Sequence, residues 1–422
     1  MNVLSEINLT CVLARENVLA GTDGPQMGYV LIEALPIGEG INERMPLNLS
    51  LVLDRSGSMA GQKIQQLQES VKLLVDTLAR DDVVSVVLFD DKADLLVPAQ
   101  LVNEKESINN LLAKIIDRGG TEISRGIKLS IEELRKNLNQ ERITRMIVLT
   151  DGQTYGDEKA SIKLVKKLHE DDIGLSVFGL GEDWNEDFLD ELAEGNGPNG
   201  RSDFIENPNE ILPRFQEVVT GMARTVTTNN LITLRLVQGV SPRQVWRVLP
   251  MIANLGYEPL SDRDVQVPLG DLQSGTGQSI LVEFTIPSRS PGRFRLAQTE
   301  ITYDVPSEGL VGQKIRADCV VNYIKDDVEA NKVNPKVMNH VEKATAFKLQ
   351  TRALDAAKTG DVGRATQLLR QSATRLLSMG ENALATVALE EASQLESDGK
   401  MSPTGTKKLR YDTQRLNKLP ED

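Results

Sequence analysis

The sequence has few of the residues that several classes of functional site require. Only 4% of its 422 residues are aromatic and the net charge is −13, so base stacking and binding to nucleic acid or anionic lipid are disfavoured. Two cysteines, Cys11 and Cys319, are too few for the disulfide framework of a secreted protein. The two histidines, His169 and His340, lie far apart in the chain, so a zinc site or a histidine-based catalytic site has no support.

Long apolar runs, targeting signals and common catalytic motifs are also missing. No stretch approaches the roughly 18 apolar residues of a membrane span, and the first residues lack the basic and apolar segments of a signal peptide. There is no Walker-type loop and no G-x-S-x-G motif, and the acidic residues after Gly181 would repel a phosphate. We therefore expect a cytoplasmic protein with reduced thiols that is not an enzyme and binds no nucleotide, nucleic acid or membrane.

Strands and helices alternate within residues 45–225. Leu47–Leu53 is an apolar run typical of a buried strand, and Lys63–Arg80 carries apolar residues on one face at helical spacing. Further strands and helices of this kind follow up to Arg224. This order predicts βαβ units and a doubly wound, Rossmann-like α/β domain with a mainly parallel sheet.

The segments on either side of this domain resemble parts of a β-sandwich. Residues 226–325 contain six predicted strands that are separated by Pro, Gly, Ser and Asp clusters. Residues 1–44 contain two more strands, which could not bury a face by themselves. We therefore predict that the α/β domain is inserted into one sandwich. The alternative is a separate N-terminal hairpin packed on the α/β domain.

The C-terminal part of the chain is predicted to be helical. Residues 326–400 fit three helices with Gly-marked turns, either a helical hairpin docked on the sandwich or one tetratricopeptide-like unit. Residues 401–422 are rich in Lys, Arg, Thr and Pro, so we expect a basic, partly disordered tail. Such a tail is either simply solvated or a docking segment for an acidic or phosphorylated partner.

Five oxygen-bearing side chains lie where predicted strands end or loops meet helices: Asp54, Ser56, Ser58, Thr121 and Asp151. Because the carboxyl ends of parallel strands share one edge of the sheet, these side chains should meet there. Two carboxylates and three hydroxyls suit a hard divalent cation, Mg²⁺ or Mn²⁺, and leave a coordination position open. Helix capping by Asp54 and the serines would explain the first cluster, but not Thr121 and Asp151.

The same residues carry a resemblance to a known family. Asp54-Arg55-Ser56-Gly57-Ser58 matches the D-x-S-x-S signature of the von Willebrand factor A (VWA) domain, and Thr121 and Asp151 match the other loops of its metal-ion-dependent adhesion site (MIDAS). The resemblance covers about Met45–Arg224. It implies a sheet with one antiparallel edge, and a Mg²⁺ whose last ligand is an acidic side chain of a partner.

The resemblance also implies a role for each site residue. Ser56 and Ser58 would bind the metal directly, and Thr121 would do so when its loop moves. Asp54 and Asp151 would hold metal-bound waters, or bind the metal directly in one conformational state. Met59–Gln62 are not acidic, so an adjacent calcium site is not expected.

Two further acidic residues, Asp157 and Glu158, follow the last metal loop closely, so we expect them to tune the choice of partner. The predicted function is metal-dependent binding of a protein that supplies a Glu or Asp. An adaptor subunit of an ATPase or signalling complex is the alternative. The sequence names neither the partner nor the oligomeric state.

Overall fold

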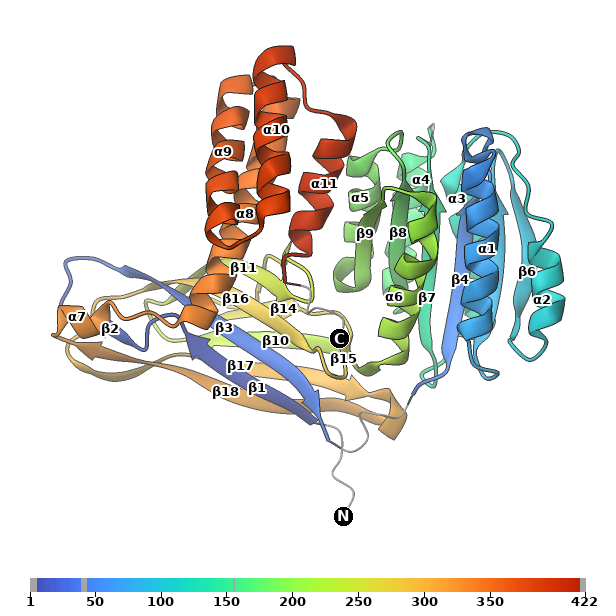
Figure 1. The fold of residues 1–422 in the computed structure, drawn as a ribbon. Helices are drawn as coiled ribbons and strands as arrows, with labels where there is room; N and C mark the ends of the chain where they lie inside the picture. The colour runs from blue at the N-terminus through green and yellow to red at the C-terminus, as the bar shows by residue number, and fades with distance from the viewer. Residues whose placement is uncertain (1–5, 39–43, 155, 418–422) are drawn as a thin grey trace. The chain divides into compact units, whose positions relative to one another are not determined.

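A computed structural model describes residues 6–38, 44–154 and 156–417. The chain divides into two compact units (Figure 1). Residues 42–225 form one unit, and the segments that precede and follow them together form the other.

The first unit is built on a six-stranded sheet in the order β6-β5-β4-β7-β8-β9. All neighbouring strands are parallel except β5 and β6, which make one antiparallel edge. The strands are β4 (Leu47–Asp54), β5 (Val83–Phe89), β6 (Ala93–Leu101), β7 (Ile143–Thr150), β8 (Gly174–Leu180) and β9 (Gly200–Ile205). Every residue of β4, β5 and β8 is buried, as expected for strands covered on both faces.

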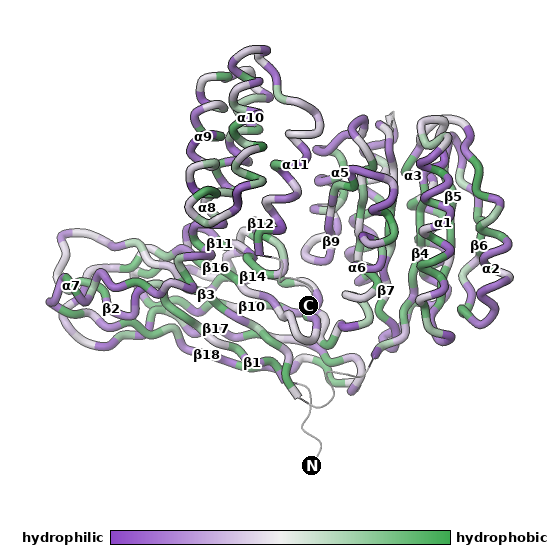
Figure 2. Tube along the Cα trace, in the orientation of Figure 1, coloured by the Kyte–Doolittle hydropathy of each residue, from purple (hydrophilic) through white to green (hydrophobic). Residues whose placement is uncertain are grey.

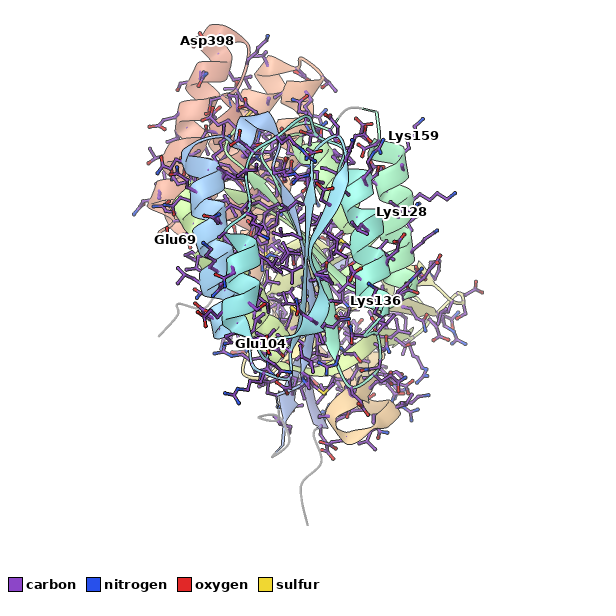
Figure 3. The ribbon with its side chains drawn as sticks, turned by 90° about the vertical axis from the view of Figure 1, so that its right-hand side faces the viewer. Glu69, Glu104, Lys128, Lys136, Lys159 and Asp398 are labelled. Carbon is purple, nitrogen blue, oxygen red and sulfur yellow. The ribbon has the colours of Figure 1, made fainter. Side chains whose placement is uncertain are left out.

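Helices cover both faces of this sheet. They are α1 (Gln62–Thr77), α2 (Lys105–Leu112), α3 (Ile123–Arg135), α4 (Glu158–Glu170), α5 (Glu186–Gly195) and α6 (Ile211–Ala223). Contacts join α1 to α2 and α6, and join α4 to α3 and α5. Figure 3 shows Glu69 of α1 on one side of the sheet and Lys128 and Lys136 of α3 on the other. In Figure 2, hydrophobic and hydrophilic residues are interleaved along α1, as in a helix with one buried face. The unit is therefore the doubly wound α/β fold that the sequence predicts.

The second unit contains two β-sheets. One has five strands in the order β1-β3-β16-β11-β12; the other has the path β13-β14-β10-β17-β18-β2, with β15 paired to β10. The strands are β1 (Glu6–Leu13), β2 (Asn17–Leu19), β3 (Gln26–Ile37), β10 (Thr225–Leu236), β11 (Ser241–Leu249), β12 (Ala253–Asn254), β13 (Glu258–Pro259), β14 (Asp264–Pro268), β15 (Leu272–Gln273), β16 (Gln278–Ile286), β17 (Gly292–Val305) and β18 (Leu310–Ile324). Apolar residues of both sheets share one hydrophobic core.

The strands that precede the α/β unit belong to this sandwich. β3 pairs antiparallel with β16 from Gln26↔Ile286 to Ala34↔Gln278. β2 pairs parallel with the end of β18, through Asn17↔Asn322 to Leu19↔Ile324. The α/β unit is thus inserted between strands of one sandwich, as predicted, and a separate N-terminal hairpin is excluded.

Both cysteines lie in the sandwich as free thiols. Cys319 is buried and Cys11 is half-buried, and the Cys11 Sγ lies 3.4 Å from the Thr299 Oγ1.

Helices complete the second unit. They are α7 (Asp327–Ala330), α8 (Pro335–Lys358), α9 (Val362–Ser378), α10 (Asn382–Asp398) and α11 (Pro403–Gln414). Residues of α8 share a hydrophobic cluster with Trp246 and Leu281 of the five-stranded sheet. The rings of Trp246 and Phe347 meet edge to face, with centroids 6.1 Å apart. The helices are therefore docked on the sandwich.

The prediction of a partly disordered tail was wrong for residues 403–417, where the chain forms α11 and packs. The Ser402 Oγ accepts a hydrogen bond from the Gly405 amide at 2.9 Å, and Pro403 occupies the first turn, so this Ser-Pro pair begins a helix. Tyr411 is fully buried, and the Asn417 side chain donates to the Val248 carbonyl at 2.7 Å. Residues 418–422 lie outside the described part of the chain.

Candidate metal site at the carboxyl edge of the sheet

Three loops meet at the carboxyl edge of the α/β sheet. Asp54 ends β4, and Asp151 follows Thr150, which ends the neighbouring parallel strand β7. Thr121 lies just before α3. A direct bond links two of these loops, because the Gly57 amide donates to the Gly119 carbonyl at 3.0 Å. The carboxyl edge is where ligands bind in open α/β sheets.

The structure brings the predicted hydroxyl and carboxylate groups together. The Oγ atoms of Ser56 and Ser58 are 3.0 Å apart, and the Ser58 Oγ donates to the Asp151 Oδ1 at 2.6 Å. A Cβ added to Gly152 would lie 3.6 Å from both the Ser58 Oγ and the Thr121 Oγ1, so Thr121 faces the same small space. The chain thus gathers these oxygen atoms from residues almost a hundred positions apart.

Asp54 lies beneath this group and is fully buried. Its Oδ1 accepts from the Ser56 amide at 2.7 Å, and its Oδ2 accepts from the Thr150 hydroxyl at 2.6 Å. Burial raises the pKa of the Asp54 carboxyl to about 6, although the hydrogen bonds from Thr150 and Ser56 act in the opposite direction.

A partly buried ion-pair cluster, with Arg55 and Asp90 at its buried end, connects the first two loops. Arg55, within the D-x-S-x-S segment, is buried, and its Nε donates to Asp90 at 2.7 Å. Arg118 lies in the loop that leads to Thr121, directly before Gly119. It donates to the same Asp90 oxygen at 2.9 Å and to Asp94 at 3.0 Å. Gly119 then takes a φ of +73°, a conformation that favours glycine. These contacts fix Thr121 relative to Ser56.

The two residues predicted to tune partner choice lie at the start of α4. Asp157 contributes to the site's architecture: its Oδ2 accepts from the Ser124 amide at 2.7 Å, and its Oδ1 accepts from the Thr154 hydroxyl. Its carboxylate therefore stabilises the start of α3, directly after Thr121. Glu158 is half-buried in the first turn of α4. Their role in partner choice stays a prediction.

One residue of the site was missed by sequence reasoning. Lys63, in the first turn of α1, forms an ion pair with the Asp151 Oδ2. Its position offered a signal, because a helix that starts directly after the first metal loop presents its first turn to the same edge of the sheet. The pairing with a residue 88 positions away leaves no local pattern.

The donor set fits a hard cation such as Mg²⁺. All its potential ligands are oxygen atoms, and neutral hydroxyls outnumber carboxylates, which suits an ion that keeps several waters. Within the described ranges there is no cluster of three or more His, Cys, Asp or Glu side chains arranged to hold a metal. A cation at this edge of the sheet would therefore depend on Ser56, Ser58 and Thr121.

The burial of Asp54 leads to a prediction about how the stability of the metal-free protein depends on pH. Its pKa of about 6 exceeds its ordinary value of 3.8, so the folded state binds the proton more tightly than the unfolded chain does. As pH rises from about 4 to about 6, ionisation of Asp54 should therefore lower the free energy of unfolding by roughly 2–3 kcal/mol. Urea unfolding in EDTA of the wild type and of Asp54→Asn across this range measures the difference, because other titrating groups are common to both. Parallel pH curves would contradict it.

Comparison with known proteins identifies two regions of the chain. Residues 48–217 match the model of the von Willebrand factor type A domain, and residues 335–419 match the Sll0103-like, C-terminal alpha-helical domain. The uncharacterized protein sll0103 of Synechocystis sp. is 28% identical over 96% of each chain. The human inter-alpha-trypsin inhibitor heavy chain H4 is 29% identical over 43% of this chain and 21% of its own.

Solved structures show the same fold over nearly the whole chain. A von Willebrand factor type A protein from Catenulispora acidiphila has a TM-score of 0.78 at 16% identity and covers 97% of both chains. The ArnB paralog VWA2 from Sulfolobus acidocaldarius has a TM-score of 0.55 at 15% identity and covers 97% of this chain and 99% of its own. Among the described residues, no helix is both long and apolar enough to cross a bilayer. Residues 48–217 are therefore similar to von Willebrand factor type A domains, and residues 335–419 to the Sll0103-like, C-terminal alpha-helical domain.

Proposed function

We propose that this chain is a divalent-metal-dependent protein-binding module that captures an acidic side chain of its partner. The observation that carries the proposal is the meeting of Ser56, Ser58 and Thr121 hydroxyls with the Asp151 carboxylate at one edge of the sheet. Asp54 is buried next to this group and accepts a hydrogen bond from the Ser56 amide. These residues would hold a Mg²⁺ or Mn²⁺ ion, and the ion would supply an electrophilic contact for an incoming ligand.

An external carboxylate is the ligand that such a site favours. The ion carries two positive charges, whereas the side chains nearest to the open face are mainly neutral hydroxyls, so the ion would keep most of its attraction for an anion. A Glu or Asp from a partner would make a strong, directed contact, and a basic side chain would be repelled. The hydroxyls and carboxylates of the site would all be engaged in holding the ion, so we propose binding rather than catalysis.

Partner capture in Mg²⁺ and in EDTA tests this proposal. We expect a partner that is retained by the wild type in Mg²⁺ and released by EDTA. Changing its Asp and Glu residues singly to Ala should reveal one position whose loss weakens Mg²⁺-dependent binding at least tenfold. Asp151→Ala in this chain should weaken both metal and partner, as measured by calorimetry.

Ser107→Ala is a matched control, because Ser107 is an exposed residue of the same domain on α2, outside the metal loops. It should bind the partner like the wild type. If no single acidic change in the partner reduces Mg²⁺-dependent binding, capture through a carboxylate is refuted even when the metal is bound.

A further inference from the structure

We propose that Lys63 determines how tightly this site holds its cation, because its ammonium group is a resident counterion of Asp151 that a divalent ion must share or displace. The inference rests on the proposed function and adds the residue that regulates the affinity of the same site. It starts from the ion pair between the Lys63 Nζ and the Asp151 Oδ2.

Both oxygens of the Asp151 carboxylate are engaged by side chains of the protein. The Oδ1 accepts from the Ser58 hydroxyl at 2.6 Å, and the Oδ2 accepts from Lys63. The Asp151 side chain is 0% exposed. A buried carboxylate is costly unless it is paired, and the nearby buried Asp54 adds a second acidic group. Lys63 therefore stabilises this arrangement of the loops by neutralising part of the charge of Asp151.

Lys63 is able to leave this position, whereas Asp151 is not. The Lys63 side chain is 29% exposed and extends from the first turn of α1 on a flexible four-carbon stem. Asp151 follows directly on a buried central strand of the sheet. A cation that approaches the hydroxyls would therefore meet an ammonium group that already neutralises part of the negative charge of the site.

This competition should weaken metal binding. Two like charges a few ångströms apart near a protein surface repel each other, and movement of Lys63 into solvent relieves part of this repulsion. We therefore expect the ammonium group to raise the metal dissociation constant by roughly tenfold. The site would then exchange its ion readily and would tolerate its absence without unfolding.

The test compares Lys63→Met, Lys63→Arg and Lys72→Met in the full chain. Lys63→Met removes the charge and keeps the length of the side chain, and Lys63→Arg keeps the charge. Lys72 lies on the same helix about 13 Å further along, so Lys72→Met controls for the change in net charge. Calorimetric titration with Mn²⁺ at low ionic strength gives the dissociation constants, and thermal melting in EDTA gives the stability of the metal-free protein.

We expect Lys63→Met to bind Mn²⁺ roughly tenfold more tightly than the wild type and to melt several degrees lower in EDTA. Lys63→Arg and Lys72→Met should stay within about threefold of the wild type in affinity. If Lys63→Met does not fold, Lys63→Gln replaces it in both measurements.

The outcomes separate the two proposals. Equal or weaker Mn²⁺ binding by Lys63→Met, with normal binding by the wild type, overturns the role of Lys63 but leaves the metal site intact. If neither protein binds Mn²⁺, the proposed function fails. The melting temperatures in EDTA then still test whether Lys63 is a counterion of Asp151. An unchanged melting temperature there overturns its role as a counterion.

Discussion

The double variant Ser56→Ala/Ser58→Ala is expected to bind no Mg²⁺ or Mn²⁺, whereas the wild type binds about one ion per chain. The two hydroxyls lie 3.0 Å apart, and Ser58 contacts Asp151, so both would be lost from the centre of the oxygen group. Thr121 and the carboxylates alone offer too few ligands for an ion that demands near-octahedral coordination. Calorimetric titration with Mn²⁺ measures this effect directly.

A second readout is thermal stability. An ion that binds only the folded state adds about 2.7 kcal/mol to the free energy of unfolding at a concentration of 100 times its dissociation constant. For a domain of this size the melting temperature should rise by roughly 5–10 °C in the wild type and not in the double variant. Ser107→Ala should respond like the wild type. Equal Mn²⁺ affinity in the double variant would refute the assignment of the site.

The second large effect concerns the sandwich. Residues 226–325 are expected not to fold by themselves, while residues 45–225 are expected to fold alone. Without the N-terminal segment, β16 loses its neighbour β3 and becomes an unpaired edge in the middle of what was a sheet. The shared core also loses apolar side chains of β1 and β3, among them Ile7, Val30 and Ile32, which are 0% exposed in the intact chain.

Circular dichroism and thermal melting of the separate fragments measure these outcomes. A cooperative transition should appear for residues 45–225 and be missing for residues 226–325. Adding residues 1–41 to the second fragment through a long Gly/Ser linker, and extending it to the C-terminal helices, should restore a cooperative transition. A soluble, cooperatively melting fragment of residues 226–325 would count against the dependence on β3.

The parts of the site that sequence predicts are those tied to backbone geometry. Asp54 and Asp151 follow apolar runs, and parallel strands place their ends at one edge, so the meeting of the loops follows from the strand pattern alone. The insertion was predictable for a similar reason, because two strands need partners to bury their apolar face.

Side-chain pairings could not be predicted in this way. Arg55 reaches Asp90 and Lys63 reaches Asp151 across distances of 35 and 88 positions, and many other charged residues could have formed the same pairs. The helix α11 was missed because its Lys and Arg residues suggested a solvated segment. In the structure both Lys407 and Leu409 of this helix are buried, with 3% and 0% of their surface exposed.

The insertion has a consequence for the order in which the protein is synthesised. β3 is complete when the ribosome has passed Ile37, but its partner β16 does not begin until Gln278. At ordinary translation speeds, β3 waits on the order of 10–50 seconds for that partner. During this time the whole α/β unit emerges and can fold. The edge of β3 that later pairs with β16 is unpaired during this time, so this strand of the nascent chain is open to pairing with other chains.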